Sequence, residues 1–193
     1  MKKLTKKEKE ELYNDSWMYI LLLTTLVILT ESLKTYKFEL LGSNITYSIL
    51  LLPLIFLITN FITKKYDYRK TVVAISISGV AMVLYIAVMS FAVGKTFVIT
   101  DISGGFCGYV ISQLVNLTIY AFLLNNTKSP GLLVYVNYLF ALIVFYMFYT
   151  LISLDKIRLD NFWSGYFVTL LVQSIICIIL TIVDKKIKRG IEK

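Results

Sequence analysis

The stretch VVAISISGVAMVLYIAVMSFAV, residues Val72–Val93, contains no charged side chain and no proline. A helix of this length is about 33 Å long, and the hydrocarbon core of a membrane is roughly 30 Å thick. Five further stretches are similarly long and apolar: Trp17–Leu33, Ile45–Ile62, Phe97–Leu124, Leu132–Leu154 and Phe162–Val183. The sequence therefore predicts six transmembrane helices.

The composition supports the same class of protein. The chain has 193 residues, of which 58% are hydrophobic, and its mean hydropathy is +0.74. One soluble core of this size could not bury so much apolar surface. Strands of a membrane barrel would be about ten residues long and would alternate in polarity, which these stretches do not. We expect an all-α integral membrane protein, a bundle of six helices in a single domain over residues 1–193.

The distribution of basic residues predicts the orientation of this bundle. Fifteen of the twenty Lys and Arg residues lie in the two terminal segments, the second connection and the fourth connection. By the positive-inside rule both termini are cytoplasmic, with basic tails at residues 1–16 and 184–193. The formal charge of +8 then reflects topology and attraction to anionic lipid, and we expect no nucleic-acid partner.

The sequence lacks the catalytic residues that several classes of enzyme require. The chain contains no His, which excludes a histidine base and a Ser-His triad. Cys107 and Cys177 lie inside apolar stretches, where we expect buried thiols and neither a disulfide nor a metal site. No phosphate-binding G-x-x-x-x-G-K-[ST] loop occurs. We expect a protein that is not an enzyme and that has no cofactor.

The polar side chains deep within the apolar stretches are uncharged. Glu31 and Asp101 lie near the outer ends of their stretches, at the level of lipid headgroups. A proton relay or an ion channel with a charged filter is therefore disfavoured. The deeper polar residues are Thr59, Asn60, Tyr109, Ser112, Gln113, Asn116, Asn137 and Gln173.

Three of these residues share one face of the fourth predicted helix. Tyr109, Gln113 and Asn116 recur at positions i, i+4 and i+7. Side-chain amides offer both donors and an acceptor, so this stripe could bind a planar polar ligand edge-on. The alternative is hydrogen bonding between helices that only holds the bundle together. The spacing leaves both interpretations open.

Small residues and a proline predict two further features. Gly104, Gly108 and Ser112 recur every fourth residue, which favours close approach of a neighbouring helix. Pro53 interrupts the second predicted helix shortly before Thr59. It either produces a packing kink or frees a backbone carbonyl towards a cavity.

Two segments carry a resemblance to a known family. The run FLITNFITKKYDYRK, Phe56–Lys70, resembles the F-L-x-T-D-x-x-x-E-x-Y-G-x-x-x-A-R-K type of signature of the queuosine precursor transporter family, also called the VUT family. The segment GYVISQLVN, Gly108–Asn116, is similar to that family's A-Y-x-x-S-Q-x-x-D segment in its fourth span. A looser likeness runs from Tyr166 into the basic tail. Order, length and helix count agree over nearly the whole chain.

The resemblance implies import of a queuosine precursor, a 7-deazaguanine base used in transfer-RNA modification, across the plasma (inner) membrane. The positions that match the family's motifs would line the substrate site: Thr59, Asn60, Tyr109, Ser112, Gln113 and Asn116. Amides would pair with the edge of the base and Tyr109 would stack on its face. The partners implied are a purine-like solute and membrane lipid.

The sequence also departs from the family pattern. Asn60 and Asn116 stand where the family usually has Asp, and Lys64 stands where it usually has Glu. Asp67 replaces a Gly of the signature. Losing acids together is electrostatically coherent, since an unpaired charge within the bilayer is costly. The departures leave in doubt which substrate is carried and how transport is driven.

We therefore expect a multi-pass transporter that moves a small, planar, mostly neutral solute by alternating access. One alternative is the substrate-binding subunit of an energy-coupling vitamin importer, which would have ATPase partner subunits. Another is a non-transporting membrane scaffold, whose amides only join helices. A homo-oligomer is compatible with each of these.

Overall fold

The computed structural model describes the backbone of residues 6–92, 99–126, 131–152 and 162–191, and the side chains of 15–92, 103–126, 132–152 and 167–183. The described chain forms six helices and one two-stranded sheet. The helices are α1 (Lys6–Leu33), α2 (Ser48–Lys65), α3 (Tyr68–Ala92), α4 (Ile99–Asn126), α5 (Gly131–Ile152) and α6 (Phe162–Ile191). The predicted all-α bundle of six helices is confirmed.

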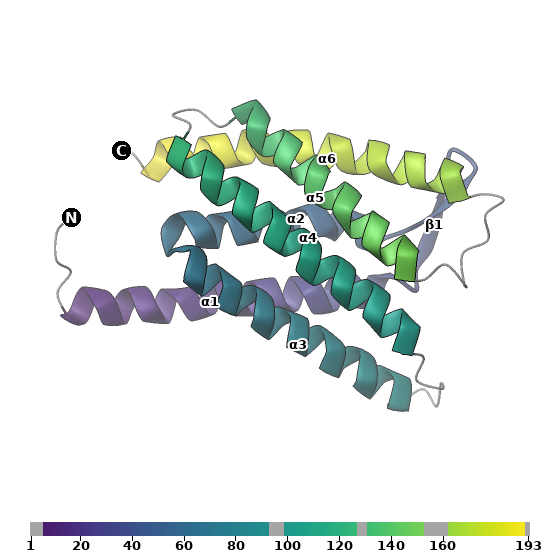
Figure 1. Cartoon of the computed structure of the whole chain (residues 1–193), viewed down its shortest axis with the longest axis horizontal. Coiled ribbons are helices and arrows are strands. Elements are labelled where there is room, and N and C mark those ends of the chain that lie inside the picture. The colour runs from purple at the N-terminus through teal and green to yellow at the C-terminus, as the bar shows by residue number, and fades with distance from the viewer. Residues whose placement is uncertain (1–5, 93–98, 127–130, 153–161, 192–193) are drawn as a thin grey trace.

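The helices run back and forth between two ends of the bundle (Figure 1). The start of α1, the end of α6 and the turn from α2 to α3 lie together on the left of the view, and we call this the termini end. The strands lie at the opposite end, which we call the hairpin end. Helix α2 contacts each of the other five helices, and α4 and α5 pair most extensively. The central helix is therefore α2, and its polar residues face neighbours on several sides.

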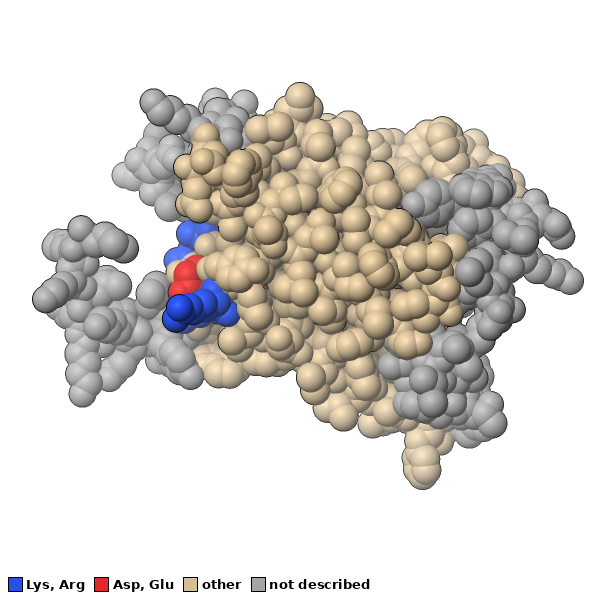
Figure 2. All heavy atoms as spheres, in the orientation of Figure 1, with Lys and Arg blue, Asp and Glu red and all other residues tan. Residues whose placement is uncertain are grey.

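Five of the helices are long and apolar enough to cross a membrane, whereas the described side chains of α6 form a shorter apolar run, Phe167–Val183. Helix α3 has two apolar faces: Val80, Leu84 and Val88 are 58–64% exposed, whereas Ala74 and Met82 are buried. An exposed apolar face of this size is expected where lipid surrounds the helix. In Figure 2 the charged side chains visible on this face lie at the termini end, and the broad middle of the face is uncharged. These features indicate a multi-pass membrane protein.

A β-hairpin lies in the connection before α2, and its last two residues, Ile45 and Thr46, belong to the stretch that was predicted to be helix. Strands β1 (Lys37–Leu40) and β2 (Ser43–Thr46) pair antiparallel, with Leu40 opposite Ser43. The turn residues Leu41 and Gly42 have φ values of 51° and 72°, as a tight two-residue hairpin turn requires. The predicted start of the second span at Ile45 was therefore wrong, because Ile45 lies in β2 and the helix begins at Ser48.

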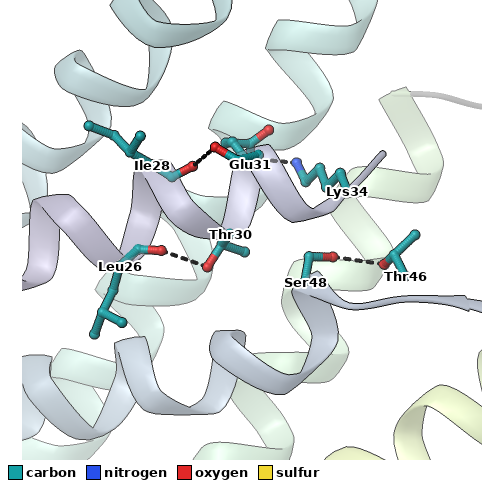
Figure 3. Close-up of polar contacts among 8 residues, drawn as sticks. Leu26, Ile28, Thr30, Glu31, Lys34, Thr46 and Ser48 are labelled. Atoms are coloured by element: carbon teal, nitrogen blue, oxygen red, sulfur yellow. Dashed lines mark hydrogen bonds and ion pairs between the residues drawn. The ribbon is translucent and has the colours of Figure 1, made fainter. Parts of the chain in front are cut away.

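The hairpin is attached to the bundle by its inward side chains. Ile45 is 2% exposed and packs with Ile49 of α2 and Val168 of α6. At the junction of β2 and α2 the hydroxyl oxygens of Thr46 and Ser48 lie 2.7 Å apart (Figure 3). The hairpin thus joins the first turn of α2 to α6.

The other observed helix boundaries differ from the predicted spans mainly in the first and sixth helices. Helix α1 begins at Lys6 and α6 continues to Ile191, so most of the predicted basic tails, residues 1–16 and 184–193, continues the helices. The predicted span boundaries at Phe97 and Leu154 lie outside the described residues.

Candidate functional site

Three side-chain amides from three helices form a chain of hydrogen bonds inside the bundle. Asn137 on α5 donates from Nδ2 to Oδ1 of Asn116 on α4, at 2.8 Å. Asn116 donates in turn from Nδ2 to Oδ1 of Asn60 on α2, also at 2.8 Å. All three residues are at most 1% exposed. We call Asn60, Asn116 and Asn137 the amide chain; it lies in the half of the bundle nearer the termini end.

A second contact joins α2 and α4 beside the amide chain. The hydroxyl of Thr59 donates to Oε1 of Gln113 at 2.8 Å, and its oxygen also lies 2.9 Å from the carbonyl oxygen of Ile55. Both Thr59 and Gln113 are fully buried. Since Thr59 and Asn60 are consecutive, α2 presents two polar side chains to α4 at neighbouring levels.

Some polar atoms of this region have no partner among the described residues. They are two amide nitrogens, Nδ2 of Asn60 and Nε2 of Gln113, and the amide oxygen Oδ1 of Asn137. A buried donor or acceptor left without a partner costs about 1–3 kcal/mol. We call the contact between Thr59 and Asn60 of α2 and Gln113 and Asn116 of α4 the α2–α4 seam. It contains two N–H donors that are free to bind another molecule.

Tyr109 and Ser112 bond to groups other than the side-chain amides. The hydroxyl oxygens of Tyr109 and Ser78 on α3 lie 2.6 Å apart, and Ser112 donates to the backbone carbonyl of Tyr109 at 3.0 Å. The ring of Tyr109 also lies against Gly79, where an added Cβ would be 3.7 Å from it. Tyr109 therefore joins α4 to α3, one to two turns away from Gln113 and Asn116.

The close approach predicted at the small residues of α4 is present at Gly108. A Cβ added there would lie 3.1 Å from the backbone carbonyl oxygen of Phe145 on α5 and 3.4 Å from its ring. Only a glycine leaves room for this contact without a shift of one helix. Helices α4 and α5 are thus held closely together beside Tyr109.

Pro53 leaves a backbone carbonyl that another helix satisfies. A proline has no N–H, so the carbonyl four residues earlier, that of Ile49, lacks its helical donor. Gln173 on α6 donates from Nε2 to this carbonyl at 3.2 Å and to the hydroxyl of Tyr146 on α5 at 2.8 Å. Pro53 therefore frees a backbone carbonyl, as one of the two alternatives expected, but this carbonyl faces a side chain of α6 where a cavity was expected.

Charged residues contact the bundle at its two ends. At the hairpin end Glu31 and Lys34 form an ion pair (Figure 3), and the Lys34 ammonium lies 5.5 Å from the centre of the Tyr149 ring. A Cβ added to Gly105 would lie 3.1 Å from the Lys34 nitrogen. Glu31 is therefore paired, and its partner crosses from α1 towards α4 and α5.

At the termini end the ammonium of Lys65 lies 3.1 Å from the carboxylate of Asp15. It also lies 4.9 Å from the centre of the Tyr19 ring and 5.3 Å from that of Tyr66. Burial raises the pKa of Tyr66, although the Lys65 charge acts in the opposite direction. These contacts join the start of the membrane-crossing part of α1 to the end of α2.

The structure brings together two pairs of predicted site residues, Thr59 with Gln113 and Asn60 with Asn116. Asn137 was not among the predicted site residues, although it lies within a long apolar stretch of the sequence. The position of its helix beside α4 was the missing information. Among the described side chains no cluster of His, Cys, Asp or Glu could hold a metal ion.

No protein-family model matches the chain, and comparisons with curated proteins and with solved structures give no match. The resemblance to the queuosine precursor transporter family therefore stays a prediction that rests on the two quoted segments.

Proposed function

We propose that this protein is a transporter that carries a small, planar, neutral solute across the plasma membrane, with both termini in the cytoplasm. The observation that supports this most is the pair of free amide donors on Asn60 and Gln113 within the apolar bundle. Polar groups inside a membrane are costly, and they commonly mark a substrate pathway. A queuosine precursor of the 7-deazaguanine type is the substrate that the sequence resemblance suggests.

The position of the amides is compatible with alternating access. They lie on the seam between α2 and α4, and each is fully buried in this conformation. Solute can reach them when these helices separate, as in transporters that rock one group of helices against another. Contacts between helices also lie at the two ends: Lys65 of α2 pairs with Asp15 of α1, and the Lys34 ammonium lies 5.5 Å from the centre of the Tyr149 ring of α5.

The experiment uses a bacterial strain that can neither make nor import the queuosine precursor. Expression of the full chain should restore queuosine in transfer RNA when the 7-deazaguanine base is supplied outside. Asn116→Leu should abolish restoration, because Asn116 orients Asn60. Asn126→Leu is the matched control: it makes the same change on the same helix, but Asn126 is exposed and bonds only the carbonyl of Phe122 among the described contacts.

Membrane levels of each variant are measured by immunoblotting. If wild-type protein is present in the membrane and no queuosine appears, this substrate is wrong. If Asn116→Leu restores queuosine as well as Asn126→Leu does, the amide chain does not serve transport.

A scaffold without transport activity is the second candidate, because the amide chain directly joins α2, α4 and α5. On that hypothesis Asn116→Leu lowers stability and changes the binding of no solute. A substrate-binding subunit of a vitamin-type importer would instead purify with ATPase subunits.

A further inference from the structure

We propose that the free N–H groups of Asn60 and Gln113 select a neutral planar ligand with two hydrogen-bond acceptors along one edge, and that they reject a ligand with a cation there. The inference rests on the transport function proposed above. It adds the charge and the hydrogen-bonding pattern of the solute.

The orientation of Asn60 is set by Asn137, through Asn116. Nδ2 of Asn137 lies 2.8 Å from the side-chain oxygen of Asn116 and 3.3 Å from its backbone oxygen. A backbone carbonyl can only accept, so Asn137 must turn its nitrogen towards Asn116. Asn116 then accepts through Oδ1 and donates to Oδ1 of Asn60. The remaining polar atom of Asn60 is therefore a donor.

The orientation of Gln113 follows from Thr59. The Thr59 hydroxyl has one proton and lies near two acceptors, the carbonyl oxygen of Ile55 at 2.9 Å and Oε1 of Gln113 at 2.8 Å. In the structure Oε1 is the amide atom of Gln113 that faces Thr59, and the Thr59 hydroxyl is its one donor among the described residues. This leaves Nε2 of Gln113 as the second free donor.

The two donors lie on one seam. Thr59 and Asn60 are neighbours on α2, and their partners Gln113 and Asn116 are separated by about 4.5 Å along α4. Two donors within one helical turn, on facing helices, match two acceptors on one edge of a flat ring system. Both side chains are fully buried in this conformation, so such a ligand enters when α2 and α4 separate.

The charge of the ligand follows from the same groups. Asn60 and Gln113 are uncharged, and both direct the positive end of an N–H dipole at the ligand. A cation at this edge would face two donors in a low-dielectric site, and the described partners of Asn60 and Gln113 include no acid that could offset its charge. The seam should therefore bind a neutral acceptor and exclude an ammonium group.

Two 7-deazaguanine probes present either a neutral acceptor or a cation on the edge that would face Asn60 and Gln113. In 7-cyano-7-deazaguanine a nitrile acceptor lies beside the ring carbonyl, whereas 7-aminomethyl-7-deazaguanine carries an ammonium group there. We expect the full-length protein in lipid nanodiscs to bind the cyano compound at least about tenfold more tightly, a difference of about 1.4 kcal/mol. Uptake into proteoliposomes is measured with both compounds.

A single substitution should change the ratio of the affinities for the cyano and aminomethyl compounds. Asn60→Asp keeps an acceptor for Asn116 and replaces the free N–H group by a carboxylate oxygen. The ratio of affinities should shift towards the aminomethyl compound by about tenfold or more. Gln173→Glu is the control, because Gln173 is an equally buried amide outside the α2–α4 seam and its change should leave the ratio unaltered.

The outcomes separate the inference from the proposed function. Transport of both probes with equal affinity, or tighter binding of the aminomethyl compound by wild-type protein, overturns the inference and leaves transport standing. A shift in Asn60→Asp no larger than in Gln173→Glu also overturns it. Neither binding nor uptake of either probe overturns both. If Asn60→Asp does not reach the membrane, the wild-type ratio alone decides.

Discussion

Replacing Asn116 by Leu should destabilise the bundle more than the same change at either end of the amide chain. Asn116 is the middle member: its side chain donates to Asn60 and accepts from Asn137, each at 2.8 Å. Leu has the same number of side-chain heavy atoms as Asn, branched at the same carbon, and it suits an apolar interior, so the change removes hydrogen bonds and leaves no cavity. The loss of stability then reports on the bonds themselves.

The magnitude follows from the number of bonds lost. A hydrogen bond between membrane helices contributes on average about 0.6 kcal/mol. Asn116→Leu loses two side-chain bonds, for a total of about 1–2 kcal/mol. Asn60→Leu loses one bond, about 0.6 kcal/mol. In the double variant the two losses should be non-additive by about 0.6 kcal/mol, because both remove the same bond.

The assay is reversible unfolding of the purified protein in mixed micelles by increasing the fraction of dodecyl sulfate, with helicity followed by circular dichroism. Asn126→Leu, at an exposed position of the same helix, should change the free energy of unfolding by less than about 0.5 kcal/mol. A cost for Asn116→Leu no larger than for Asn126→Leu, or additive effects in the double variant, would refute the reasoning.

Two further predictions concern packing and topology. Gly108→Ala should lower the free energy of unfolding by about 1–3 kcal/mol, since the new methyl group meets the rigid carbonyl of Phe145; Gly105→Ala should cost less, because it meets the flexible end of Lys34. The same micelle titration compares them, and equal costs would contradict this account. Leu41→Cys, in a version without the two native cysteines, places a thiol at the exposed tip of the hairpin. A membrane-impermeant maleimide should label it in intact cells if both termini are cytoplasmic, whereas labelling only after lysis would reverse the orientation.

The sequence predicted the helices well because the length of an apolar run reports directly on a membrane-crossing helix. Its failure at Ile45 has a physical cause. A four-residue strand whose inward side chains are Ser43 and Ile45 has too little alternation to stand out beside the apolar run that follows it. The turn at Leu41 and Gly42, both with positive φ, is recognisable only once the two strands are paired.

The partners of the buried amides could not be predicted for a different reason. In a soluble helix the polar face identifies the side turned to water, but α3 exposes Val80 and Leu84 while it buries Ala74. Lipid and protein neighbours are both apolar, so hydrophobicity does not fix how a membrane helix is rotated. The spacing on α4 therefore predicted a buried stripe, and it could not show that Asn137 would complete it or that Tyr109 would turn to α3.

The bond from Gln173 to the carbonyl of Ile49 has a consequence for the order in which the protein is made. The two residues are 124 positions apart, and the chain is synthesised from its N-terminus. Helix α2 thus emerges from the ribosome with an unpaired carbonyl before Pro53, and its partner in α6 is made 124 residues later. Until α6 is made, this carbonyl has to find a temporary partner, such as water or the insertion machinery, and α2 reaches its final hydrogen bonding only after α6 has entered the bundle.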